Sequence, residues 1–318
     1  MSDEERFLLR ALELARRGCG HTRPNPPVGA VVVKGGKVVG VGWHRRAGGD
    51  HAEVAAIKSA ARHGVKSLKG AALYVTLEPC SKPGRVGACT DAIIAAGISK
   101  VVYAVPDPNP KNRGRASRVL SKAGVKCERS RNNVVNCLVR ELVGPFAKHV
   151  ATGLPYVTVK IAMSLDGKIC DDWGNAKWIS SEAARRETGR MRERVDAIMV
   201  GGETIRRDDP SLLSHGRPNP DLIRVVVSKS GKLPKNAQVF TDGKGETLVF
   251  ADARKALREL GRRGFLHVLC EGGLKLAVSL AEAGLVDEWI TVHAPKVIGT
   301  KPIAKATCIK EVKCLQDW

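Results

Sequence analysis

The sequence predicts two α/β domains that meet near residue 150. Short runs of Val, Ile and Leu alternate with segments of helical periodicity in both halves of the chain. Between the halves, the stretch ATGLP at 151–155 combines Gly and Pro and marks a boundary. A length of 318 residues also fits two domains better than one. We therefore expect one domain over residues 1–150 and a second over residues 151–318.

In the first half, strands and helices alternate in a way that favours a three-layer α/β domain. Helices are predicted from apolar residues at 3.6-residue spacing, and strands from short apolar runs bounded by turn residues. A Gly-Gly pair predicts a hairpin turn between the first two strands. Helices are expected over residues 4–17, 51–64, 89–96 and 115–123. A strand hairpin is expected over residues 24–44, and single strands over 71–80, 100–105 and 125–127.

A last helix of the first half is expected over residues 133–150, interrupted around Gly144-Pro145. The second half restarts with the apolar strand YVTVKIAMS, and a helix is expected at about 180–194. Further apolar strands are AIMVGG, RVVVS, TLVFA and HVLCEGG, with helical segments between them. This order predicts a second α/β domain of doubly wound character.

The formal net charge of +21 is unusual for a globular chain. Nucleic acid, a phosphorylated small molecule, or a generally basic proteome would each account for it. The charge is scattered, with no block of five like charges and no interleaved aromatic residues that would stack on bases. A nucleic-acid partner is therefore not expected.

The beginning of the chain, MSDEERFLLRALELARR, is acidic and amphipathic, unlike a signal peptide. No apolar run approaches the length of about 18 residues that spans a membrane. A reduced, cytoplasmic setting is the expectation, and in such a setting the nine cysteines are ligands or core residues rather than disulfides.

The clearest chemical motif combines a histidine, a glutamate and two cysteines. HAEV places His51 and Glu53 at the start of a helix. TLEPC places Cys80 after a strand, and Cys89 opens the next helix. Three nitrogen and sulfur ligands leave the fourth position of zinc to water, as catalytic zinc sites do. A carboxylate two residues from the histidine can carry the proton of that water.

This pattern fits the signature of zinc base deaminases, His-x-Glu followed by Pro-Cys, with one difference. The second cysteine follows the first by nine residues here, whereas that signature has three. The alternatives are a structural zinc site or a fortuitous cysteine pair. A structural site would require a fourth protein ligand, and none stands nearby with ligand spacing.

The chain resembles the bifunctional deaminase/reductase family of riboflavin biosynthesis. The resemblance rests on PNPPVGAVVV, HAEV, TLEPCSKPGRVGACTDAI and DPNP in the first half. It continues in TGLPYVTVKIAMSLDGKI, WISS, DAIMVGGETIRRDDPSL and CEGGLKLAVSL, and covers roughly residues 4–300. It implies a cytidine-deaminase-like domain followed by a dihydrofolate-reductase-like domain.

The resemblance implies two reactions on a phosphoribosylated pyrimidine. Zinc-dependent hydrolysis converts 2,5-diamino-6-ribosylamino-4(3H)-pyrimidinone 5′-phosphate to the aminouracil, and NADPH then reduces its ribosyl chain to ribityl. It implies zinc ligands at His51, Cys80 and Cys89, with Glu53 as proton donor. It implies cofactor contacts at Ala162, Trp178, Thr204, Asp208, Gly272 and Gly273. It implies substrate contacts at Asn25, Arg192, Leu212, His215 and Glu271, and a homodimer or larger homo-oligomer.

Four features depart from the family pattern. Lys82 stands where the family commonly has histidine, and Ala176 where it often has serine. His215 occupies the place of an expected arginine, with Arg217 close by. The chain also stops earlier than is usual in the family.

Two alternatives to the two-activity enzyme stay open at this point. One is a deaminase whose reductase half has decayed or changed its substrate. The other is an RNA-directed deaminase-like module, which the charge of +21 would suggest.

Overall fold

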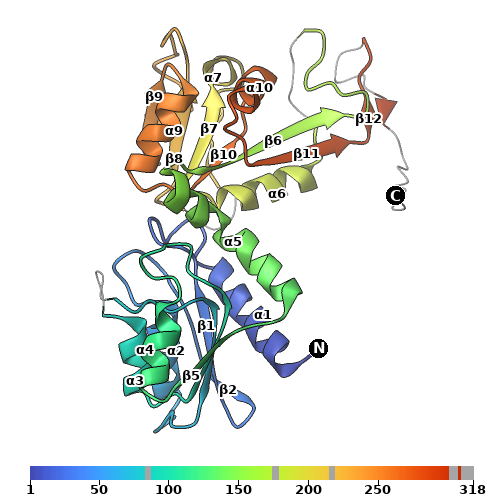
Figure 1. The fold of residues 1–318 in the computed structure, drawn as a ribbon. Helices are drawn as coiled ribbons and strands as arrows, with labels where there is room; N and C mark the ends of the chain where they lie inside the picture. Colours follow the sequence, from blue (N-terminus) through green and yellow to red (C-terminus); the bar gives the residue numbers. More distant parts are fainter. Residues whose placement is uncertain (83–86, 174–178, 215–218, 301–306, 309–318) are drawn as a thin grey trace. The chain divides into compact units, whose positions relative to one another are not determined.

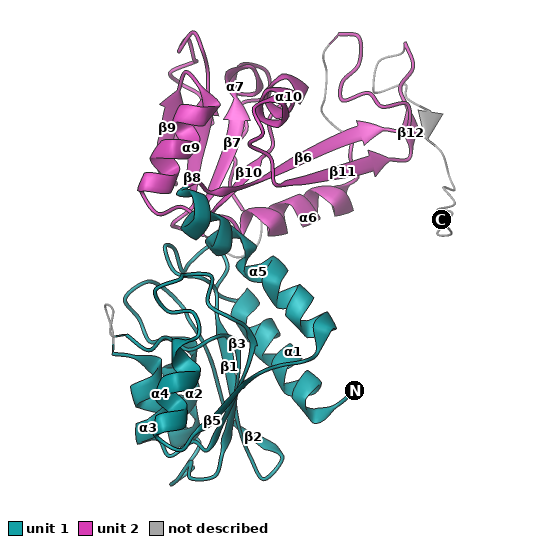
Figure 2. Cartoon of the chain, in the orientation of Figure 1, with its two compact units in different colours: residues 1–153 teal, residues 154–318 magenta. Residues whose placement is uncertain are grey.

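Two units, residues 1–153 and 154–318, make up the chain (Figure 2). Each has its own sheet with helices packed against it, so both units are α/β, as the sequence predicts. The structure is a computed structural model, and it describes residues 1–82, 87–173, 179–214, 219–300 and 307–308. Among these residues, no helix has the length and apolar character needed to cross a membrane.

Unit 1 is organised around a five-stranded mixed sheet with the order β2-β1-β3-β4-β5 (Figure 1). Strand β1 runs antiparallel to β2 and β3, and β3, β4 and β5 are parallel to one another. The strands are β1 (Gly29–Lys34), β2 (Lys37–Trp43), β3 (Ala72–Leu77), β4 (Lys100–Val105) and β5 (Lys126–Arg129).

Helices cover both faces of this sheet (Figure 1). Alternate residues of β1 point to opposite faces: Val31 packs with α1, and Val32 packs in the cluster that includes the buried alanines of α2. The result is the expected three-layer arrangement. The helices are α1 (Asp3–Arg16), α2 (Ala52–Arg62), α3 (Cys89–Ala95), α4 (Arg115–Lys122) and α5 (Asn133–Thr152).

Helix α5 corrects one prediction. The expected interruption at Gly144-Pro145 does not occur, and the helix continues through Pro145 to its left-handed C-cap at Gly153. Proline removes one backbone donor and disturbs one turn, but it does not forbid the turns on either side. The buried residues Val135, Val139 and Val143 lie before the proline and tie this part of the helix to the core.

Glycines of β2 let α2 approach the sheet closely. A Cβ atom at Gly42 would lie 2.3 Å from the Ala56 nitrogen and 2.5 Å from the Ala52 oxygen. Both atoms belong to the helix backbone, which cannot move aside as a flexible side chain would. This packing fixes α2, and with it the residues at its N-terminal end.

Gly42→Ala is therefore expected to destabilise unit 1 by about 1–3 kcal/mol or more, the usual cost of overpacking. Urea unfolding measures the change. Gly144→Ala is the matched control, because no atom lies within 4 Å of a Cβ built there and alanine favours a helix. Equal stability of Gly42→Ala and the wild type would contradict the close approach of α2.

Unit 2 contains a six-stranded sheet whose strands all run parallel, in the order β11-β6-β10-β7-β8-β9. The strands are β6 (Tyr156–Ser164), β7 (Ala197–Gly201), β8 (Ile223–Val227), β9 (Thr247–Phe250), β10 (His267–Cys270) and β11 (Glu288–Ala294). A small antiparallel pair follows, β12 (Lys296–Val297) with β13 (Thr307–Cys308).

Apolar clusters lie on both faces of this sheet, as in a doubly wound fold. Ala197 and Met199 of β7 pack in one cluster with α9 and α10, whereas Ile198 and Val200 pack in another with α7. The helices are α6 (Glu182–Arg192), α7 (Gly202–Asp208), α8 (Gln238–Thr241), α9 (Ala253–Arg262) and α10 (Leu274–Glu282).

Candidate functional site

Unit 1 brings together the three residues that the sequence predicts as zinc ligands. The Nδ1 atom of His51 lies 3.2 Å from the Sγ of Cys89 and 3.5 Å from the Sγ of Cys80. All three ligand atoms lie within 4.8 Å of one another. His51 and Cys89 come from helix N-termini, since His51 is the N-cap of α2 and Cys89 is the first residue of α3.

This group fits zinc in donor type and in number. One imidazole nitrogen and two thiol sulfurs are the borderline-soft ligands that zinc prefers. Within the described part of the chain, the cluster of possible ligands has three members. A tetrahedral ion held by three side chains keeps its fourth position open, which distinguishes catalytic from structural zinc sites.

Hydrogen bonds within this group shift the pKa of Cys80. Hydrogen bonding from Cys89, followed by that from His51, lowers the pKa of Cys80 to about 4, although burial opposes this. The backbone nitrogen of Cys89 also donates to the Cys80 sulfur, at 3.3 Å. The lowered pKa favours the thiolate of Cys80, which is the form that binds zinc.

Glu53 lies in the first turn of α2 and is 3% exposed. Burial, and then the negative charge of Cys80, raise its pKa to about 7. A carboxyl group with a pKa near neutrality can both accept and release a proton, as a proton shuttle requires.

A pocket of about 220 Å³ opens beside these residues, and we call it the zinc-side pocket. Asn25, another predicted site residue, lines it together with His44. The His44 Nδ1 atom lies 3.0 Å from the Asp50 carbonyl, so this nitrogen carries the proton. The Nε2 atom then accepts from the Asn25 amide at 3.1 Å, which orients that side chain in the pocket.

Polar residues of the loop after β4 complete the zinc-side pocket, and the sequence analysis did not single them out. They are Asp107, Asn109 and Asn112, in and after the DPNP stretch. The buried carboxylate of Glu78 holds this loop by accepting from the backbone nitrogens of Asp107 and Gly114, at 3.3 and 3.1 Å. The clue in the sequence was the polar run directly after a buried strand.

Unit 2 has a second pocket, of about 210 Å³, which we call the glycine-turn pocket. It lies where the carboxyl ends of β6 and β10 meet the N-termini of α7 and α10. Most of the predicted cofactor residues line it, namely Ala162, Thr204, Asp208, Gly272 and Gly273.

The glycine turn fits a phosphate-bearing cofactor. Gly273 is the N-cap of α10, and nothing lies within 4 Å of a Cβ built at this residue. The backbone is therefore open to a ligand, and the N–H groups of the first helical turn favour an anion there. NADPH brings such a group in its pyrophosphate.

Two of the predicted substrate residues of unit 2, Arg192 and Glu271, pair with each other at this pocket. Arg192 and Glu271 make a bidentate ion pair, with distances of 2.6 and 2.9 Å, and both side chains are nearly buried. Arg192 also donates to the carbonyl of Leu213 at 2.9 Å. Leu212 is buried and has a left-handed backbone, with φ of 54°.

Lys160 also lies at this pocket, although it was not among the residues predicted from the sequence. It lies on β6 and lines the glycine-turn pocket with Glu271. Burial lowers its pKa, and the charge of Glu271 opposes that shift. A lysine as the one charged residue of a mostly apolar strand, YVTVKIAMS, was the signal that could have identified it.

Two predicted site residues, Trp178 and His215, lie outside the described residues. The departures at Ala176 and Arg217 also lie outside them, as do most residues after position 300.

Comparison with known families accounts for both units. Residues 1–105 match the cytidine and deoxycytidylate deaminase zinc-binding region, and residues 155–315 match the RibD C-terminal domain. Riboflavin biosynthesis protein RibD of Bacillus amyloliquefaciens is 39% identical, over 93% of this chain and 85% of its own. The protein of the same name from Aquifex aeolicus is 35% identical, over 93% of this chain and 88% of its own.

Solved structures agree over nearly the whole chain. A diaminohydroxyphosphoribosylaminopyrimidine deaminase/5-amino-6-(5-phosphoribosylamino)uracil reductase from Thermotoga maritima superimposes with a TM-score of 0.85 at 33% identity. Acinetobacter baumannii RibD does so with a TM-score of 0.80 at 32% identity. Each comparison covers 98% of this chain and 92% of the other. The resemblance inferred from the motifs is thus confirmed, and the chain belongs to the RibD family of riboflavin-biosynthesis enzymes.

Proposed function

We propose that unit 1 deaminates 2,5-diamino-6-ribosylamino-4(3H)-pyrimidinone 5′-phosphate and that unit 2 reduces the ribosyl chain of the product. The observation that carries this proposal is the group of His51, Cys80 and Cys89 at the zinc-side pocket, with Glu53 beside it. The full-length match to deaminase/reductase proteins supports the second activity. The cofactors are zinc and NADPH.

Deamination replaces a ring amino group with oxygen from water and releases ammonia. His51, Cys80 and Cys89 would hold the zinc ion, which would supply the Lewis acidity that makes water nucleophilic near neutral pH. Glu53 takes one proton from this water and delivers it to the departing nitrogen, a transfer that its raised pKa favours. Asn25, oriented by His44, presents its amide oxygen to the pyrimidine.

Reduction converts the ribosyl group to ribityl, so C1′ gains a hydride, the C1′–O4′ bond breaks and O4′ gains a proton. NADPH, when bound, supplies the hydride. Lys160 is the group in the glycine-turn pocket that supplies the proton. The Arg192–Glu271 pair positions the sugar, because a rigid bidentate pair presents fixed hydrogen-bonding atoms.

The alternative of a decayed reductase half receives little support from the site. Residues from β6, α7 and the glycine turn converge on one pocket, and the Arg192–Glu271 pair is intact. An assay of NADPH oxidation with the deaminated pyrimidine decides the matter. Deamination without oxidation would favour the decayed form.

Purified protein is expected to contain about one zinc ion per chain, as one site with three protein ligands requires. Elemental analysis measures it. Cys89→Ala should lose both the zinc and the deaminase activity, because two protein ligands remain, and should keep NADPH oxidation.

Cys137→Ala is the control for this experiment, because Cys137 is exposed on α5 and outside the ligand group. It should keep the zinc and both activities. A Cys89→Ala protein that retains a full equivalent of zinc would contradict the ligand assignment.

A further inference from the structure

The loop from Asp209 to Leu213 is held in an unusual backbone conformation. Asp209 and Leu212 both have positive φ, 40° and 54°, and neither is glycine. Side chains with a Cβ rarely adopt this region, so surrounding contacts must maintain it. Strain of this kind gathers where a protein needs one exact loop geometry.

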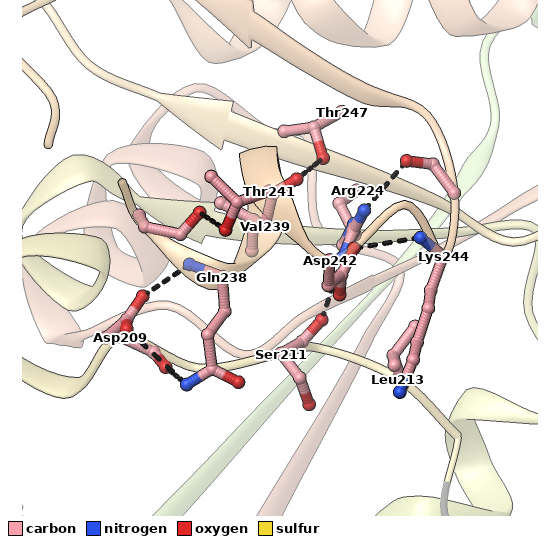
Figure 3. Close-up of polar contacts among 12 residues, drawn as sticks. Asp209, Ser211, Leu213, Arg224, Gln238, Val239, Thr241, Asp242, Lys244 and Thr247 are labelled. Atoms are coloured by element: carbon pink, nitrogen blue, oxygen red, sulfur yellow. Dashed lines mark hydrogen bonds and ion pairs between the residues drawn. The ribbon is translucent and has the colours of Figure 1, made fainter. Parts of the chain in front are cut away.

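Arg224 is the first of two anchors that hold the loop (Figure 3). It lies on β8 and is 1% exposed, one of the largest fully buried side chains among the described residues. Its Nη1 donates to the Ser211 carbonyl at 3.3 Å and to the Asp242 carboxylate at 2.7 Å. Its Nη2 donates to the Gly245 carbonyl at 2.7 Å. One guanidinium thus joins the loop to the segment after α8.

Gln238, the first residue of α8, is the second anchor. Its side-chain nitrogen donates to the Asp209 carbonyl at 2.7 Å, and its backbone nitrogen donates to the Asp209 carboxylate at 2.8 Å. Figure 3 shows the two side chains facing each other. Gln238 is exposed, so the hydrogen bond from its side chain can be removed without opening the core.

The C-terminal end of this loop is connected to the glycine-turn pocket by hydrogen bonds. The Leu213 carbonyl accepts from Arg192 at 2.9 Å, and Arg192 forms the bidentate pair with Glu271, which lines the pocket. Arg224 and Arg192 therefore bind carbonyls two residues apart on one loop. Movement of this loop would shift Arg192 and, through it, Glu271.

Stability alone does not explain a buried arginine at this position. Removing a guanidinium from water is costly, and a well-packed apolar residue often stabilises a core as much as an ion pair does. The Arg224 Nε also lacks a hydrogen-bond partner among the described residues. What the guanidinium offers, and an apolar side chain does not, is several donors in fixed directions.

We propose that Arg224 and Gln238 are positioning residues for the reductase site. They fix the Asp209–Leu213 loop so that Leu212 and the Arg192–Glu271 pair present the geometry that binds the pyrimidine substrate. The proposal rests on the proposed function of unit 2. It assigns the anchors an effect on substrate binding that is separate from cofactor binding and from any change in overall stability.

The test compares Arg224→Lys and Gln238→Ala with the wild-type enzyme. Lysine keeps the charge opposite Asp242 but cannot reach the Ser211 and Gly245 carbonyls with the same fork. Arg262→Met is the matched control, because it breaks an ion pair with Glu259 on α9, at the surface of the same unit. The readouts are KM and kcat for NADPH oxidation, the Kd of NADPH, and amide hydrogen exchange at residues 209–213.

Both variants are expected to raise KM for the deaminated pyrimidine by roughly tenfold, the loss typical of a removed hydrogen bond to an aligned group. Exchange at 209–213 should accelerate, whereas the Kd of NADPH and the control variant should match the wild type. If Arg224→Lys fails to fold, the KM and hydrogen exchange of Gln238→Ala test the proposal without it.

An unchanged KM in Gln238→Ala together with unchanged exchange would overturn the proposal, whatever the melting temperatures are. Failure of the proposed function is a different result, in which the wild-type enzyme itself does not oxidise NADPH. In that case hydrogen exchange at 209–213 still tests the anchors. If exchange is unchanged in both variants, Arg224 and Gln238 do not fix the loop. If exchange is faster in both variants and not in the control, they do.

Discussion

Glu53→Gln is expected to reduce deamination by roughly 10²–10⁴-fold, the range that a lost general acid–base group produces. Glutamine has nearly the same shape and can still form hydrogen bonds, but it cannot carry a proton between water and the leaving ammonia. The buried position of Glu53 leaves bulk water poorly placed to substitute for it. Release of ammonia from the diaminopyrimidine measures the effect.

Two further measurements identify the cause of this loss. The variant should retain its zinc, because Glu53 is not a member of the ligand group. It should also retain NADPH oxidation with the deaminated substrate, since that pocket lies in the other unit. Glu141→Gln, at an exposed position of α5, is the control and should behave as the wild type does. A Glu53→Gln enzyme that deaminates at the wild-type rate would exclude the proton shuttle.

Lys160→Met is expected to lower NADPH oxidation by roughly 100-fold or more, because no proton donor would then stand in the glycine-turn pocket at that place. Methionine fills a similar volume along β6, so the loss should appear in kcat rather than in folding. Stopped-flow oxidation of bound NADPH measures the step directly.

A role of Lys160 as proton donor also predicts how the rate of NADPH oxidation changes with pH. Burial lowers the pKa of Lys160, and the protonated amine is the form that donates. The wild-type rate should therefore fall as the pH rises through that lowered pKa, and this fall should be missing from the residual rate of Lys160→Met. Lys255→Met, at an exposed position of α9, is the control. An unchanged oxidation rate in Lys160→Met would assign the proton to another group.

The elements that depend on local pattern were predictable from the sequence. Strands β1 and β2 follow from short apolar runs on either side of a Gly-Gly turn, and α2 follows from its 3.6-residue periodicity. The expected helix interruption at Pro145 was wrong, because a local rule cannot weigh the packing of the turns before it. Strand β11 was not expected, since its pairing with β6 depends on residues more than a hundred positions away.

The residues of the candidate sites likewise include some that a local motif predicts and others that depend on distant contacts. His51, Glu53 and Cys89 could be selected because each opens a helix within a short motif. The role of His44 could not, because it depends on contacts with the distant Asn25 side chain and the Asp50 carbonyl. Arg224 was also missed, because its partners come from two loop segments that only the tertiary structure brings together.

The strand order of unit 2 has a consequence for how the chain is made. Strand β6 opens this unit, yet its two neighbours in the sheet are β10 and β11. During synthesis neither edge of β6 can pair until β10 has left the ribosome, whereas β1 of unit 1 meets β2 at once. Unit 1 can fold and take up its metal while unit 2 is still being translated. The nascent second half, with an apolar strand exposed for that interval, is the part more exposed to aggregation during synthesis.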